Sequence, residues 1–162
     1  MLSTHIEDTM TESDFIINTF FLLFCGCLVM FMALGFAMLE AGSVRIKSVA
    51  VILVKNIGLY AIAGIMFYLL GYNLMYKDVG SFIGTFSTWV PDDNAAKSGD
   101  FSAGYASAAG WFFQMVFAAT AISIVSGAVA ERVKVIPFLL FAAIMTAIIY
   151  PIYGSWTWGG GF

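Results

Sequence analysis

The sequence has few charged or chemically reactive side chains. Its 162 residues include 7 Lys and Arg, 10 Asp and Glu, 2 Cys, 3 Pro and one His. That histidine, His5, lies in the polar N-terminal segment, and neither an HExxH metal motif nor a Walker-type phosphate loop occurs. We therefore predict no enzyme activity, no catalytic residues, no metal site and no cofactor. The net charge of -3 also argues against a nucleic acid partner, because such partners bind basic patches.

The two cysteines do not form a redox or metal motif. Cys25 and Cys27 are separated by a single residue inside a long apolar run. This spacing is too short for the usual pairs of zinc ligands or for a Cys-x-x-Cys redox motif. We expect both thiols to behave as small apolar side chains.

Apolar residues dominate what is present. The chain is 61% hydrophobic and 10% charged, whereas soluble domains have about 25% charged residues. Four apolar runs can be drawn, at 15–39, 49–76, 103–130 and 135–158. Each exceeds the roughly 20 residues needed to cross a bilayer, and in lipid such a run must be helical because its backbone groups need internal partners. The sequence predicts a single all-α membrane domain over 1–162 with four transmembrane helices.

The charges between the runs predict an orientation. Arg45 and Lys47 lie in the first connection, and Glu131, Arg132 and Lys134 lie in the third. The segment before the first run contains acids but no Lys or Arg. The positive-inside rule therefore places these two connections in the cytoplasm and the N-terminus outside. We expect Glu131 and Arg132 to form a solvated or interfacial pair. The first run is too long for a cleaved signal peptide.

A few polar residues interrupt the apolar runs. Lys55 lies eight residues past Lys47, roughly 12 Å deeper in a helix, where a charge is costly. Its alternatives are a buried gating or pairing role, a side chain that snorkels, or one held by backbone carbonyls. Glu40 is expected to pair with Arg45 or Lys47. Asn56 and Asn73 are expected to form hydrogen bonds between helices rather than to act as ligands.

Small residues recur every four positions in two of the runs. This pattern lets helix backbones approach closely in a membrane. Close helix packing is one interpretation, and the lining of a narrow conduit is the other. The residues are Ala33, Ala37 and Ala41 in the first run and Ala119, Ser123 and Gly127 in the third.

Aromatic residues in the third run share one helix face. Phe113 and Phe117 are four residues apart, so their rings lie on the same side of a helix, with Gln114 beside them. Counted back from Glu131, Phe117 lies about 21 Å above the cytoplasmic boundary. The pattern places this aromatic pair in the outer third of the bilayer.

Trp158 ends the fourth run on the same side of the membrane. A straight helix would put it about 14 Å higher than Phe117. Pro151 should kink the helix and free a carbonyl near Ala147, which reduces this gap. A cation site and an interfacial belt residue are both open for Trp158. The belt interpretation applies equally to Trp89, Trp111 and Trp156.

Several motifs in this order resemble the ammonium transporter (Amt/Mep/Rh) family, and the wording is closest to its Amt branch. The resemblance covers the chain from about Phe31 onward. The motifs are MALGFAMLEAGSVRIKS, VKNIGLYAIAGIMFYLLGYNL, FFQMVFAATAISIVSGAVAERVK and YPIYGSWTWGGG. The four runs are thereby similar to the first four helices of the eleven-helix ammonium transporter fold.

The resemblance implies transport of ammonium or ammonia, with methylammonium as an analogue. It implies an external ammonium site containing Phe117 and Trp158, with Phe113 and Gln114 in support. It also implies a homotrimer in the plasma or inner membrane and a PII-type regulatory protein as a partner. The family's gating Phe, supporting Asp and pore histidines fall beyond residue 162, so the chain is expected to be an incomplete N-terminal part.

Two other functions remain open from the sequence. The same helices could form the membrane module of an ammonium sensor that controls a signalling domain. They could also form a stand-alone structural or assembly subunit with four helices. Sequence downstream of these helices would separate the three interpretations.

Overall fold

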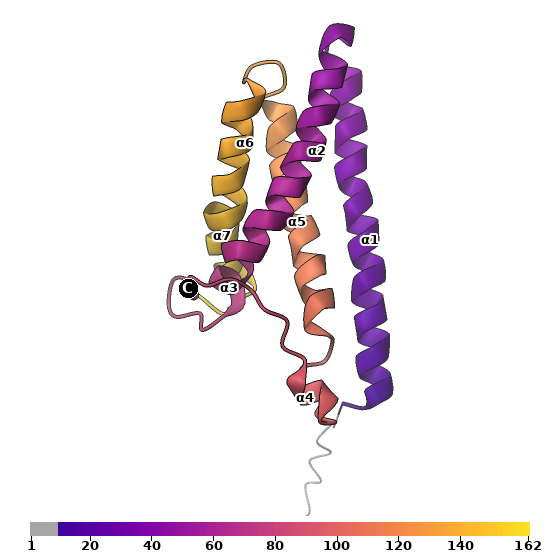
Figure 1. Cartoon of the computed structure of the whole chain (residues 1–162), viewed down its shortest axis with the longest axis vertical. Helices are drawn as coiled ribbons and strands as arrows, with labels where there is room; N and C mark the ends of the chain where they lie inside the picture. Colours follow the sequence, from indigo (N-terminus) through magenta and orange to yellow (C-terminus); the bar gives the residue numbers. More distant parts are fainter. Residues whose placement is uncertain (1–9) are drawn as a thin grey trace, which may run out of the picture.

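The protein is a bundle of long helices (Figure 1). The computed structural model describes residues 10–162, and no strand occurs within that range. The predictions for His5 and for most of the N-terminal segment lie outside the described residues. The α-helices are α1 (Glu12–Ser43), α2 (Val49–Met66), α3 (Tyr72–Tyr76), α4 (Asn94–Lys97), α5 (Ser107–Ala128), α6 (Val135–Ile144) and α7 (Tyr150–Thr157).

The four predicted membrane-spanning segments are confirmed. Helices long and apolar enough to cross a membrane cover Glu12–Ser43, Ile46–Tyr76, Ser107–Ala128 and Val135–Thr157. The first begins earlier than predicted because Thr11 and Asp14 form a capping box. Thr11 Oγ1 accepts a bond from the Asp14 amide, and the Asp14 carboxylate accepts one from the Thr11 amide, both at 3.2 Å. These bonds satisfy amides that the first helical turn leaves free.

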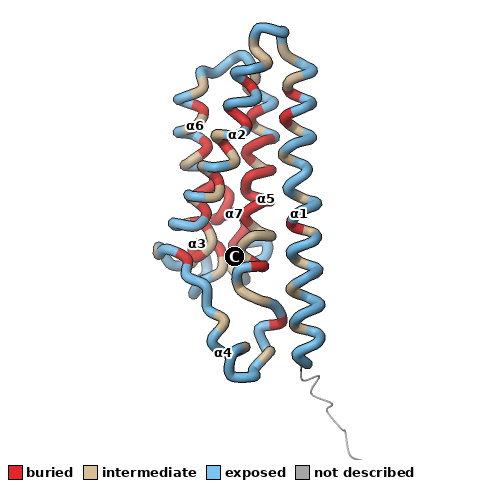
Figure 2. The backbone as a smooth tube through the Cα atoms, turned by 45° about the vertical axis from the view of Figure 1, so that its right-hand side comes forward, coloured by how far each residue is buried: buried red, intermediate tan, exposed pale blue. Residues whose placement is uncertain are grey.

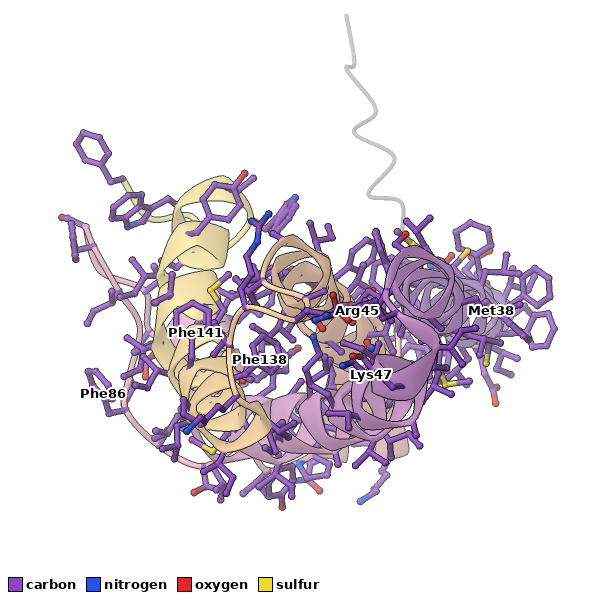
Figure 3. All side chains as sticks on the ribbon, turned by 90° about the horizontal axis from the view of Figure 1, so that it is seen from above. Met38, Arg45, Lys47, Phe86, Phe138 and Phe141 are labelled. Atoms are coloured by element: carbon purple, nitrogen blue, oxygen red, sulfur yellow. The ribbon has the colours of Figure 1, made fainter. Side chains whose placement is uncertain are left out.

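Helix α5 forms the centre of the bundle, and α1 lies at its edge. Of the most apolar 18-residue stretch of each helix, 50% of the residues are buried in α5 and 11% in α1. Figure 2 shows this contrast along the two helices. Phe138 points inward among the helices, whereas Met38 on α1 points away from them (Figure 3). One core cluster joins α2, α5 and α6 through Leu59, Ala63, Ala119, Ile122, Phe138 and Ala142.

The small residues predicted to pack lie at several helix contacts: Ala37 lies beside α2, and Ala119 belongs to the core cluster of α2, α5 and α6. Ala37 is 8% exposed, and Ala119 and Ser123 are fully buried. Gly26, also on α1, faces the ring of Phe112 on α5, which a Cβ at that position would approach to 2.7 Å. Close helix packing therefore accounts for these rows, as expected for helices that associate in lipid.

Two π-helical turns widen the second and fourth spans. They cover Phe67–Gly71 and Met145–Ile149, and they contact each other. Pro151 follows the second turn and lacks the amide that would bond the Ala147 carbonyl. The predicted irregularity near Ala147 is thus present as a π turn, while the turn that ends at Gly71 was not predicted. A Cβ on Gly71 would lie 2.9 Å from the Thr146 carbonyl oxygen, so glycine permits the close crossing.

The two ends of the bundle differ in their connections (Figure 1). Residues 44–48 and 129–134 form short connections at one end, which we call the short-loop end. The longer connection from residue 77 to residue 106 contains α4 and lies toward the other end, which we call the α4 end. The chain also ends toward the α4 end, beside α3.

Candidate functional site

Helix α5 presents the predicted aromatic pair on one face. The rings of Phe113 and Phe117 meet edge to face, with centroids 5.1 Å apart and planes at 73°. Both side chains and Gln114 are half-buried. The opposite side of α5 is packed into the bundle, since Val116, Ala118 and Ala119 are fully buried. The pair is therefore a rigid aromatic surface on a helix held by the core.

Trp158 lies at the C-terminal end of α7. Its amide donates to the Gly154 carbonyl at 2.8 Å, its side chain is 54% exposed, and its ring lies edge-on to Tyr153 at 6.4 Å. Within residues 10–162, the ring pairs of Phe117 and Trp158 are with Phe113 and Tyr153 and not with each other. A shared ammonium site of Phe117 and Trp158 stays a prediction.

The glycines after Trp158 let the chain turn closely past the end of α3. The amide of Gly159 donates to the Ser155 carbonyl at 3.1 Å, and that of Gly161 donates to the same carbonyl at 2.9 Å. A Cβ on Gly159 would lie closer than 3.0 Å to the Met75 carbonyl oxygen, so any side chain there would clash with the end of α3. The glycines bring the segment after Trp158 directly against α3.

Trp156 does not behave as a free belt residue. Its indole Nε1 donates to the Phe82 carbonyl at 2.7 Å, and its ring lies 5.0 Å from the ring of Phe82. Ser155 Oγ donates to the same carbonyl at 3.3 Å. Trp156 therefore pins the long connection to α7, and its role as an interfacial belt residue stays a prediction.

Trp89 and Trp111 also depart from the belt interpretation. Trp89 is only 7% exposed and stacks on Trp111 at 5.3 Å and 18°. Tyr68 and Tyr72 meet the Trp89 ring edge-on at 5.9 and 5.7 Å. The four rings form an aromatic cluster between the π turn Phe67–Gly71, α3, α5 and the long connection. Sequence spacing gave no sign of it, because Trp89 lies outside the apolar runs.

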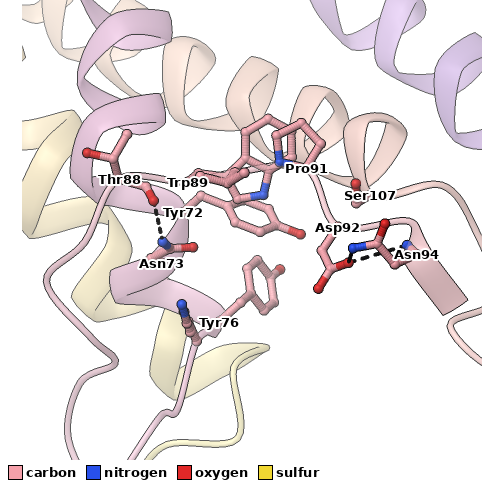
Figure 4. A pocket seen from close by; sticks show the side chains of 11 residues that line it. Tyr72, Asn73, Tyr76, Thr88, Trp89, Pro91, Asp92, Asn94 and Ser107 are labelled. Carbon is pink, nitrogen blue, oxygen red and sulfur yellow. Dashed lines mark hydrogen bonds between the residues drawn. The ribbon is translucent and has the colours of Figure 1, made fainter.

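A hollow of about 550 Å³ opens beside this aromatic cluster (Figure 4). Its wall includes Tyr72, Asn73, Tyr76, Trp89 and Asp92, while Phe117 and Trp158 do not line it. The Asn73 amide nitrogen donates to Ser87 Oγ at 2.9 Å and to the Thr88 carbonyl at 3.0 Å. The expected helix-to-helix bond of Asn73 is therefore replaced by bonds that fix the long connection.

Buried charges gather near the short-loop end. Lys55 is 3% exposed and Glu40 is 4% exposed, and Lys55 Nζ lies 3.3 Å from Glu40 Oε2. Lys55 also donates to the Ser126 carbonyl at 3.1 Å. Snorkelling is thus wrong for Lys55, whereas pairing and a backbone carbonyl both hold it. The expected pairing of Glu40 with Arg45 or Lys47 is wrong as well.

Arg45 instead pairs across the bundle end. Its Nε lies 3.2 Å from Glu131 Oε1, so Glu131 does not form the expected pair with Arg132. Glu131 has a positive φ of 61°, a conformation that is uncommon for a residue other than glycine. Hydrogen bonds from Ser48 and then Arg45 lower the pKa of the Glu131 carboxyl. This exposed pair joins the two short connections.

These observations define a class: an all-helical protein, over the described residues, with four helices long and apolar enough to cross a membrane. The chain belongs to the ammonium transporter family, whose model matches residues 20–162. It is therefore part of a family of transporters embedded in membranes.

Named relatives agree with this assignment. Ammonium transporter Amt2 of Archaeoglobus fulgidus is 46% identical over 141 residues, which make up 86% of this chain and 28% of the relative. Ammonium transporter 3 of Dictyostelium discoideum is 37% identical over 160 residues, or 96% of this chain and 34% of the relative. A solved structure named Sensor Amt Protein matches with a TM-score of 0.78 and 32% identity, and covers 93% of this chain and 36% of that one. The chain thus spans about a third of the length of these proteins.

Proposed function

We propose that a full-length protein containing this chain transports ammonium or ammonia across a membrane, with methylammonium as an alternative substrate. Family membership supports the reaction. The single structural observation that carries the proposal is the aromatic face of α5, where Phe113 and Phe117 are held edge to face against a packed helix. Such rings attract a cation that is leaving water.

The proposed external ammonium site consists of Phe117 and Trp158, with Phe113 and Gln114 in support. An ammonium ion has no apolar surface and loses hydration in the membrane, so ring faces replace part of the lost interaction, worth up to about 2 kcal/mol when desolvated. The half-buried state of Phe117 and the exposed ring of Trp158 leave both rings accessible to further helices or a ligand. The Gln114 amide supplies polar atoms beside Phe113.

The remaining parts of the proposal concern assembly and partners. We place the gating Phe, the supporting Asp and the pore histidines of the full-length protein outside residues 1–162. We also propose a homotrimer in the plasma or inner membrane, with a PII-type regulator on the cytoplasmic side. The large exposed apolar residues of α1, among them Phe20, Phe24, Leu28 and Phe31, support contacts with lipid and with further membrane-spanning helices.

The direct test of function is growth on low ammonium. In cells without their own ammonium carriers, the full-length protein should restore growth near neutral or acidic pH, and residues 1–162 alone should not. The short chain lacks the proposed pore histidines, and the substrate path of such transporters runs between two repeats. Rescue by residues 1–162 alone would overturn this account of the pore, and failure of the full-length protein would overturn the function.

The proposed orientation places the short-loop end in the cytoplasm. Arg45, Lys47, Arg132 and Lys134 all lie at that end, as the positive-inside rule requires. In a background without Cys25 and Cys27, cysteines introduced by Ser43→Cys and Lys134→Cys should be shielded from an impermeant thiol reagent in intact cells. The matched variant Asn94→Cys should react, since all three positions are exposed. Labelling in the reverse pattern would invert the orientation.

A sensor is the second candidate function, because the matched solved structure is named Sensor Amt Protein. In that case the same helices would bind ammonium and pass a conformational change to a signalling domain. The downstream coding sequence distinguishes the two, since a kinase or cyclase module would favour sensing. Ammonium uptake by the full-length protein would favour transport.

A further inference from the structure

The buried charges near the short-loop end form a small network across three helices. Glu40 comes from α1, Lys55 and Asn56 from α2, and Ser126 from α5. One carboxylate oxygen, Glu40 Oε2, accepts three bonds: from Lys55 Nζ at 3.3 Å, from Asn56 Nδ2 at 3.3 Å and from Ser126 Oγ at 3.0 Å. We call these four residues the Glu40 network. The proposed ammonium site does not include any of them.

The ammonium group of Lys55 is held by two hydrogen bonds and an aromatic ring. This group has three N–H donors. Two reach Glu40 Oε2 and the Ser126 carbonyl, and the group also lies 4.9 Å from the centre of the Phe138 ring, within the range of a cation–π contact. Lys55 and Glu40 therefore neutralise each other inside the bundle, and neither charge faces lipid.

Two acceptors in the Glu40 network have no donor. Glu40 Oε1 and Asn56 Oδ1 are buried without a hydrogen-bond partner in the described part of the chain. Unpaired buried acceptors are unfavourable, and ordered water commonly satisfies them. A water molecule has two donors to offer and adds no charge. An ammonium ion would leave the neutral pair with one excess positive charge, so water is the ligand that the charge balance favours.

Hollows from the short-loop end reach the two charged residues. One of about 230 Å³ is lined by Lys47, Ser48, Lys55 and Glu131. Another of about 270 Å³ is lined by Glu40, Ser43 and Gly127 among others. Glu40 is three residues, or about 5 Å, from the last residue of α1, so the path from the bundle end is short. The network is thus buried but close to a source of water.

Helix α1 packs along α5, but only a few polar contacts join it to the rest of the bundle. Only 11% of its most apolar stretch is buried. In lipid, the burial of apolar surface does not drive helices together as it does in water, so polar contacts matter more for the position of α1. Its polar ties at the α4 end join it to the backbone around Gly104 and Ala106, through Asn18 and Thr19. At the short-loop end, Glu40 is the residue of α1 that forms polar contacts with α2 and α5.

We propose that Glu40 and Lys55 form an ion-pair lock, completed by one water molecule on Glu40 Oε1 and Asn56 Oδ1, that fixes the position of α1 against α2 and α5. This inference does not depend on whether the protein transports or senses ammonium. A buried ion pair often adds little stability over an apolar pair, but loss of one partner leaves a buried charge unpaired. The lock therefore acts by penalising every position of α1 that separates Glu40 from Lys55.

The test uses the full-length protein in detergent and measures its melting temperature. Lys55→Ala leaves Glu40 unpaired and should lower the melting temperature on the order of 10 °C. The double variant Glu40→Gln with Lys55→Met carries no charge and should recover at least half of that loss. Lys47→Ala is the control, because Lys47 is exposed on the short connection before α2, and it should leave the melting temperature unchanged.

Chemical rescue separates charge pairing from general packing. Ethylammonium is small enough to occupy the space left by Lys55→Ala and to pair with Glu40. It should raise the melting temperature of Lys55→Ala but not that of the wild type or the double variant, while tetramethylammonium, which has no N–H donor, should have no effect. If Lys55→Ala does not assemble, assembly of the double variant supports the lock. A double variant as damaged as Lys55→Ala, or equal effects of the two cations, would overturn it.

The water molecule has its own test. An experimental density map of the full-length protein should show one peak within hydrogen-bond distance of both Glu40 Oε1 and Asn56 Oδ1. The peak should persist in a sample prepared without ammonium. Absence of the peak would refute the water, and a peak that requires ammonium would assign the site to a cation instead.

Discussion

The two ends of the bundle are held together by different chemistry. At the short-loop end, buried and exposed ion pairs join segments far apart in the chain, through Glu40 with Lys55 and Arg45 with Glu131. At the α4 end, aromatic rings and close backbone crossings do this work, through the Trp89 cluster and the glycines that cross α3. The proposed ammonium site consists mainly of aromatic residues, as does the packing at the α4 end.

The difference shows where the molecule keeps charge. The two carboxylates at the short-loop end, Glu40 and Glu131, are each paired with a cation, so they offer little to a passing ammonium ion. Phe113, Phe117 and Trp158 carry no charge, but the faces of their rings can attract a desolvated ammonium ion.

The largest effect on stability is expected at the crossing of the two π turns. Gly71→Val would place a Cβ 2.9 Å from the Thr146 carbonyl oxygen and 3.2 Å from Pro151 Cγ. Overpacking against backbone of this kind costs about 3 kcal/mol, measured as the loss of melting temperature of the full-length protein. Gly35→Val is the matched control, since a Cβ there meets nothing within 4 Å. Equal effects of the two variants would remove the close crossing from this account.

A smaller effect is expected from a single hydroxyl at the short-loop end. Ser126→Ala removes a donor from the Glu40 carboxylate and should destabilise the protein by about 1.5–3 kcal/mol, as for other bonds to charged groups. Ser123→Ala is the control, because its equally buried hydroxyl only donates to the Ala119 carbonyl within its own helix. A loss for Ser123→Ala as large as that for Ser126→Ala would show that the carboxylate contact does not matter.

At the α4 end, Asn73→Ala should release the long connection. The Asn73 amide bonds to Ser87 and Thr88, and loss of these bonds should destabilise this region by about 1–2 kcal/mol. Limited proteolysis between residues 77 and 93 measures the effect, and it should become faster. Asn94→Ala, whose amide only bonds to the nearby Asp92, should leave the cleavage rate unchanged. Unchanged cleavage for Asn73→Ala would mean that other contacts hold the connection.

The smallest effect is expected for the exposed ion pair. The Arg45 side chain is 68% exposed, and such pairs contribute little to stability, so Arg45→Ala should not measurably shift the melting temperature. The pKa of Glu131 is lowered, so the stabilisation of the folded protein by its ionised carboxylate is present above the ordinary carboxyl pKa. This stabilisation is lost as the pH falls through the lowered value. A clear loss of stability for Arg45→Ala at neutral pH would make the exposed pair as important as the buried one.

The sequence predicted the helices well because the membrane imposes a length and a polarity on each span. It also predicted that Phe113 and Phe117 would meet, since residues four apart on a helix are neighbours. These are local relations, and each is confirmed within one helix.

Long-range partners were predicted less well. Glu40 was assigned to cations in the nearest connection, whereas its partner Lys55 lies on the next helix, at a depth that only the packing of α1 on α2 determines. The roles of Asn73 and Trp156 depend on where the long connection folds back. That path follows no periodic pattern, so the sequence offered no signal for it. The placement of Trp158 relative to Phe117 depends on helix packing in the same way.

The central claim is that Phe117 and Trp158 bind the ammonium ion, and transport kinetics of the full-length protein test it most directly. Trp158→Leu keeps apolar bulk but removes the ring, and it should raise the apparent KM for ammonium or methylammonium about tenfold with the amount of assembled protein unchanged. Phe117→Leu should act in the same direction, and the double variant should fall short of the sum because the rings share one ion. Phe86→Leu, an exposed ring on the long connection that points away from the bundle (Figure 3), is the control and should leave the KM unchanged. An unchanged KM for Trp158→Leu, or a loss explained by less assembled protein, would contradict the claim.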